Sequence, residues 1–176
     1  MALSLEDLPD VRAEMLSELE DDISNGTLYF SPRLKEGCDA QYRELLRQAI
    51  EEHDDEWLGT QIRSRGLLRT HEIRNMKTGP VQAKVPVTAP QTLAEGEFNR
   101  FCCRAVCCSS LAAGEEAVEV YRAKAVTDPR PESQQKLGSR VPPRSLLDDL
   151  RKNIGIDTAL GIPAGPNSGL SVRRIR

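Results

Sequence analysis

The spacing of apolar residues along the chain predicts several helices that pack around one long helix. Apolar side chains recur every three or four positions in residues 8–23, 39–50 and 57–62, as they do on one face of an amphipathic helix. The longest helical segment runs from about residue 88 to residue 113. Its apolar positions cover much of the circumference, so we expect this helix to be buried and Gly114 to end it.

Shorter segments alternate between apolar and polar residues, as strands do. Residues 67–76 and 81–87 flank a Lys-Thr-Gly-Pro turn and predict a β-hairpin. Residues 117–124 contain β-branched and aromatic side chains and predict a further strand, and residues 27–30 form a shorter β-prone run. The pattern as a whole predicts an α+β fold, in which several helices surround one long central helix beside a small antiparallel sheet.

The end of the chain is expected to be an extended arm. Residues 127–143 form a polar, proline-broken loop, and residues 145–151 predict a short helix. Residues 153–176 are rich in glycine and proline and too poor in apolar side chains to fold on themselves. The expected organisation is therefore a single α+β domain over residues 1–152, followed by an extended C-terminal arm over residues 153–176.

Composition adds an uneven distribution of charge. The chain has 176 residues, 39% of them hydrophobic, and a net charge of −3, which suits one compact domain. Residues 1–56 carry 16 acidic and 5 basic residues, whereas residues 57–176 carry 11 acidic and 19 basic residues. Such asymmetry is typical of head-to-tail association between copies, and equally of two halves that neutralise each other within one fold.

Neither a membrane span nor a signal peptide is expected from the sequence. No apolar run approaches the ~18 residues that a transmembrane helix needs. The first residues, Met-Ala-Leu-Ser-Leu-Glu-Asp, are acidic rather than basic, which is not the pattern of a secretory leader. The expectation is an intracellular protein with no membrane partner.

Four of the five cysteines form one cluster in the predicted long helix, namely Cys102, Cys103, Cys107 and Cys108. Cys103 and Cys107 are four positions apart on one helical face, a spacing that would allow two soft metal ligands or a nucleophile. Neither of the two histidines lies near them in sequence, so small buried hydrophobic side chains are the favoured interpretation. Glycine-rich residues 161–169 lack the lysine of a phosphate-binding loop. We expect no cofactor, no metal and no enzymatic activity.

The C-terminal third of the chain is basic and supplies the candidate interaction residues, which are Arg130, Arg140, Arg144, Arg173, Arg174 and Arg176. A basic surface is typical of phosphate binding, so contact with DNA is one interpretation. No aromatic residue follows Tyr121, which disfavours stacking on single-stranded nucleic acid. The other interpretation is pairing with the acidic N-terminal half, within the chain or in another copy.

Several runs of the chain resemble small uncharacterised proteins encoded among tailed-bacteriophage head genes. The likeness covers roughly residues 93–172 and rests on the runs Ala94-Glu-Gly-Glu-Phe-Asn-Arg-Phe, Val120-Tyr-Arg-Ala-Lys, Pro129-Arg-Pro-Glu-Ser, Leu146-Leu-Asp-Asp-Leu-Arg and Gly165-Pro-Asn-Ser-Gly-Leu-Ser. None of these runs is a catalytic signature, and the resemblance supplies no site residues.

This resemblance implies a structural, non-enzymatic component of a phage-type particle, at the head or the head–tail connector. Such a protein would act through subunit–subunit contacts, in a homo-oligomer or with other particle proteins. It would reside in the virion after assembly in the bacterial cytoplasm. The long polar loop, the extended arm and the divided charge suit such contacts. The alternative is a small nucleic-acid-binding protein that uses the basic C-terminal third.

Overall fold

The computed structural model describes residues 2–77, 79–154 and 169–175, and it has the predicted α+β class. The helices in these residues are α1 (Leu8–Asn25), α2 (Asp39–Glu52), α3 (Asp55–Ser64), α4 (Ala89–Ala112), α5 (Pro131–Gln135) and α6 (Pro143–Lys152). The strands are β1 (His71–Met76), β2 (Gly79–Lys84), β3 (Val118–Arg122), β4 (Arg140–Val141) and β5 (Leu170–Arg174).

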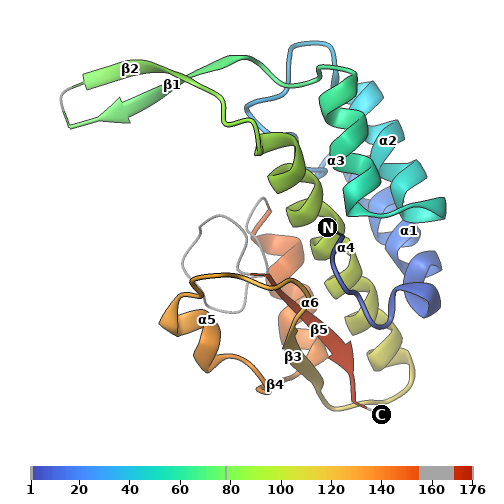
Figure 1. The fold of residues 1–176 in the computed structure, drawn as a ribbon. Helices are drawn as coiled ribbons and strands as arrows, with labels where there is room; N and C mark the ends of the chain where they lie inside the picture. The colour runs from blue at the N-terminus through green and yellow to red at the C-terminus, as the bar shows by residue number, and fades with distance from the viewer. Residues whose placement is uncertain (1, 78, 155–168, 176) are drawn as a thin grey trace.

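Helix α4 is the centre of the fold, as the sequence predicts. It runs through the middle of the molecule, with α1 and α3 on one side and α6 and the small sheet on the other (Figure 1). Phe98, Phe101 and Ala105 on α4 are fully buried, because neighbouring elements cover it on several sides. Gly114 follows α4 in the left-handed conformation at φ 72°, and its N–H donates to Leu111 O.

The sheet beside α4 is antiparallel and has the strand order β4–β3–β5. Val120 of β3 pairs with Val172 of β5, and both side chains are buried. Asn99 of α4 donates to Leu170 O at 2.8 Å, which ties the last strand to the central helix. The described end of the expected C-terminal arm, residues 170–174, is thus a strand of the chain's own sheet. The rest of the arm, residues 155–168 and 176, lies outside the described residues.

The predicted hairpin is formed by β1 and β2, which pair with each other and with no other described strand. It projects from the end of the molecule near the start of α4 (Figure 1). The β-prone run at residues 27–30 is not a strand, so that expectation was wrong. Leu28 instead packs into the core after the end of α1, where apolar burial outweighs β-propensity.

A buried arginine joins α1 to α4. Arg104 Nε donates to Glu18 Oε2 at 2.7 Å, and its Nη1 donates to Asp22 Oδ2 at 2.6 Å. Arg151 of α6 donates to the same Glu18 carboxylate at 3.0 Å. Burial alone would raise the pKa of Glu18, but hydrogen bonds and charge from Arg151 and Arg104 bring that pKa below its usual value. Two acidic residues of the N-terminal half, Glu18 and Asp22, are therefore neutralised within the chain.

A second buried arginine lies one turn earlier on α4. Arg100 Nη2 donates to Glu97 Oε2 at 2.5 Å, and its guanidinium carbon lies 5.1 Å from the centroid of the Phe101 ring. Burial raises the pKa of Glu97, and the positive charge of Arg100 limits that rise. Arg100 and Arg104 are fully buried, so the helix that the sequence predicts as a broad apolar surface also contains two cations.

No helix in the described residues is long and apolar enough to cross a lipid bilayer.

The variant Arg104→Met should lower the free energy of unfolding by about 3–5 kcal/mol, because it leaves Asp22 buried without its cation and removes one of two cations from Glu18. The matched control is Arg47→Met, since Arg47 pairs with Glu20 and Glu44 at the surface and should contribute less than about 1 kcal/mol. Urea unfolding followed by circular dichroism measures both variants. Equal losses in the two variants would contradict a special role for the buried cation.

Candidate functional site

The hairpin β1–β2 is the most exposed part of the described fold. None of its described residues is buried. Ile73, Met76 and Val81 have exposed fractions of 69%, 59% and 48%, and Val87 just after the hairpin reaches 87%. Large apolar side chains are costly to leave in water, so their concentration on one projecting element indicates a contact surface.

The apolar side chains lie on both faces of the hairpin. Residues that are directly opposite in an antiparallel pair share a face. Val81 lies opposite Arg74 on one face, and Ile73 lies opposite Gln82 on the other. Neither face therefore covers the core of this chain. A two-stranded ribbon exposed on both faces has little stability of its own and gains from a partner that encloses it.

Polar contacts fix the base of the hairpin. Arg33 Nε donates to Glu72 Oε2 at 2.6 Å, and the Arg74 guanidinium lies 2.7 Å from the same carboxylate. The hydrogen bonds from Arg33, and then from Arg74, lower the pKa of Glu72. The N–H of Val85 donates to Thr70 O at 2.9 Å. The hairpin consequently has a defined direction at its base, while its tip extends away from the fold (Figure 1).

A groove of about 640 Å³ lies beside this base, between the end of α3 and the segment that leads into α4. Apolar and basic side chains line it together, among them Ile62, Leu68, Val87, Arg63, Arg69 and Lys84. An acidic segment with apolar side chains would match such a lining.

The hairpin and the groove form one positively charged surface, which we term the cationic ribbon and define as residues 61–77 and 79–88. Residues 61–88 contain six basic residues and one acidic residue. All six basic side chains are exposed, and they are Arg63, Arg65, Arg69, Arg74, Lys77 and Lys84. The single acidic residue, Glu72, is half-buried and already paired. We did not predict this surface from the sequence, although residues 61–88 contain a local excess of positive charge.

The structure places Arg173 and Arg174 of the predicted interaction set in ion pairs within the chain. Arg173 Nη1 lies 2.7 Å from Glu6 Oε1, and its Nε donates to Glu119 at 3.1 Å. Arg174 Nε donates to Glu115 at 3.0 Å. These carboxylates interrupt the positive surface that the sequence suggested. Arg176 lies outside the described residues.

The other three predicted interaction residues come from separate elements. Arg130 precedes α5 and is half-buried, and Arg144 is exposed in the first turn of α6. Arg140 on β4 is exposed and lies opposite Glu119 of β3 in the sheet register. The five described arginines of this set therefore come from several elements, and Arg173 and Arg174 already pair with carboxylates of the chain.

The cysteine cluster is built into the core. Cys102, Cys103 and Cys107 are buried, and Cys108 is half-buried. Burial raises the pKa of Cys102 and Cys107, and burial together with the Glu18 carboxylate raises the pKa of Cys108 to about 11. Cys103 Sγ contacts Asn99 Oδ1 at 3.7 Å. Thiols of this kind are protonated at neutral pH, which disfavours both metal ligation and nucleophilic attack. No three His, Cys, Asp or Glu residues in the described part of the chain are arranged to hold a metal ion.

Comparisons with protein-family models, with curated proteins and with solved structures find no match for this chain. Function is therefore inferred from the geometry of the hairpin and the groove.

Replacing residues 73–82 by Asn-Gly should leave the fold intact. Glu72 and Ala83 are partners in the ladder, so a two-residue turn of this type can join them directly. We expect the free energy of unfolding to change by less than about 1 kcal/mol, because the removed residues pack on no part of the core. Urea unfolding followed by circular dichroism tests this, and a loss of several kcal/mol would show that the hairpin belongs to the folding core.

Proposed function

We propose that this protein is a structural, non-enzymatic component of a phage-type particle, at the head or the head–tail connector, and that it acts through subunit–subunit contacts. The observation that carries the proposal is the cationic ribbon, whose apolar side chains are exposed on both faces of a projecting hairpin. In this proposal the hairpin is the element that reaches a neighbouring protein.

The distribution of exposed apolar side chains supports a protein partner. Five large hydrophobic residues are exposed in the described part of the chain, and four of them lie between residues 73 and 87. The fifth, Ile154, follows α6. Large exposed apolar side chains that cluster on one projection are typical of an interface, whereas scattered ones need no explanation.

Contact with DNA is the alternative, and one observation favours it. A two-stranded ribbon fits the major groove of a duplex, and residues 61–88 have five more positive than negative charges. If DNA is the partner, the surface expected to contact it is therefore the hairpin and not the basic C-terminal third. The exposed Ile73, Met76 and Val81 favour the protein partner, because the phosphate backbone that dominates DNA affinity offers no matching apolar surface.

The double variant Ile73→Thr and Val81→Thr should weaken self-association. Threonine keeps the β-branched shape that suits a strand and removes apolar surface without changing the charge. Light scattering across protein concentration should show a wild-type mass above that of the monomer and a variant shifted towards the monomer. The matched control, Ile154→Thr, changes an exposed apolar residue outside the ribbon and should behave as wild type.

A wild-type protein that stays monomeric at every concentration and salt would contradict subunit contacts between copies. Duplex binding by that monomer, lost on hairpin shortening and weakened steeply by salt, would establish the DNA alternative.

A further inference from the structure

We infer that the partner of the cationic ribbon is a second copy of this chain, and that the ribbon docks on the outer surface of that copy's helices α1 and α2. The inference rests on the proposed function, since it names the partner of the same hairpin. It is carried by two surfaces of opposite charge that are separate in the structure.

The outer surface of α1 and α2 is uniformly acidic. Every exposed charged residue of these two helices is acidic. We term these residues the acidic face, and they are Asp10, Asp21, Asp39, Glu44, Glu51 and Glu52. The basic side chains of the same helices are all partly buried, and Arg47 pairs at the surface with Glu20 and Glu44. Arg12, for example, donates to Ile50 O at 2.5 Å and to His53 O at 2.8 Å. Because α1 packs beside α2, these exposed acids belong to two neighbouring helices.

Three of these acidic charges are placed where their own helices do not stabilise them. Asp21 is in the last turn of α1, and Glu51 and Glu52 are in the last turn of α2. Neither of these last turns contains a basic residue. Negative charge near a helix C-terminus opposes the helix dipole. The structure shows that Asp22 pairs internally with Arg104, while Asp21 remains exposed.

The end of α1 also offers a place for an apolar side chain. A cavity of about 250 Å³ lies there, lined by Ile23, Leu28 and Phe30 together with Asp22 and Arg43. A single hydrophobic side chain from a hairpin tip, such as that of Met76, would enter the apolar part of this lining, next to the exposed Asp21. The acidic face therefore complements both the charge and the exposed apolar side chains of the cationic ribbon.

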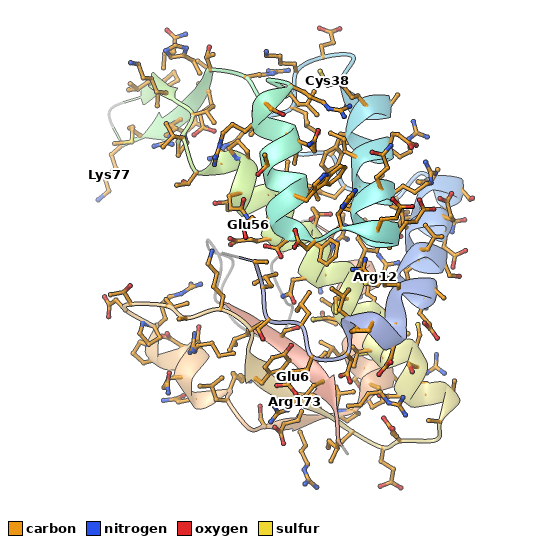
Figure 2. The ribbon with its side chains drawn as sticks, turned by 45° about the vertical axis from the view of Figure 1, so that its right-hand side comes forward. Glu6, Arg12, Cys38, Glu56, Lys77 and Arg173 are labelled. Carbon is orange, nitrogen blue, oxygen red and sulfur yellow. The ribbon has the colours of Figure 1, made fainter. Side chains whose placement is uncertain are left out.

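The two surfaces lie on opposite sides of the molecule, so they serve two different neighbours. Figures 1 and 2 show the hairpin projecting from one side, and α1 and α2 covering the other. A contact that joins two different patches is heterologous, and it repeats from copy to copy into a ring or a filament. DNA would account for the cationic ribbon alone, and the acidic face would repel it.

Paired charge reversals test this docking. The ribbon variant carries Lys77→Glu and Lys84→Glu, and the face variant carries Asp21→Lys and Glu51→Lys. All four side chains are exposed, so the fold should tolerate each change. Either variant alone should raise the dissociation constant for self-association at least about tenfold, because like charges then face each other. An equimolar mixture of the two variants should recover association, since each reversed surface meets its complement.

Matched controls reverse the same amount of charge elsewhere. Arg144→Glu with Lys152→Glu controls for the ribbon variant, and Glu116→Lys with Glu132→Lys controls for the face variant; all four positions are exposed. Both controls should associate as wild type does. Sedimentation velocity measures the dissociation constants, and circular dichroism verifies that each variant is folded.

The outcomes separate this inference from the proposed function. The partner of the hairpin lies elsewhere if the ribbon variant and the Ile73→Thr, Val81→Thr variant both weaken association but the face variant does not. It also lies elsewhere if the equimolar mixture fails to recover association. That result would overturn the inference and leave subunit contact through the hairpin standing. If the wild-type protein never associates, the proposed subunit contact fails with it. Recovery in the mixture, with both controls unchanged, is the result we expect.

Discussion

The pairing of buried Arg104 with Glu18 and Asp22 is the constraint on which the rest of the fold depends. A guanidinium that is removed from water must be paired and hydrogen-bonded, so α4 packs closely only where α1 presents both carboxylates. Arg151 binds the same Glu18 carboxylate and draws α6 into the arrangement. This requirement fixes the register of three helices more tightly than apolar contact does, because apolar contact is non-directional.

The internal pairing also decides which charges remain for the surface. Of the acidic N-terminal half, Glu18 and Asp22 are used in the core, whereas Asp21, Glu51 and Glu52 stay exposed in last turns that contain no basic residue. The sequence left open whether its charge asymmetry is neutralised within one chain or between chains. Interior ion pairs support the first interpretation for the core, and the acidic face opposite a cationic ribbon supports the second for the surface.

Periodicity was sufficient to predict the central helix, the hairpin and the α+β class, because each depends on local spacing. It did not anticipate that Arg100 and Arg104 are buried, since a hydrophobic pattern counts every arginine as polar.

Strand β5 was missed because its pairing with β3 joins residues that are distant in sequence, and its run Leu-Ser-Val-Arg-Arg is short. The same tertiary pairing gives Arg173 and Arg174 their carboxylate partners within the chain, which local spacing could not predict. The positive charge excess that marks the cationic ribbon is present in residues 61–88, but it is not apparent when charge is counted over the two halves of the chain.

A head-to-tail contact leaves every open assembly with one unused cationic ribbon and one unused acidic face at its ends. The unused ribbon keeps Ile73, Met76 and Val81 in water, and the unused face keeps Asp21, Glu51 and Glu52 exposed at the ends of their helices. A closed ring is the only finite arrangement of such copies in which every ribbon and every face is occupied. Because the Arg33–Glu72 ion pair already orients the base of the hairpin, less conformational entropy is lost when the hairpin docks. Closure would then be favoured by the same two surfaces that drive the first contact.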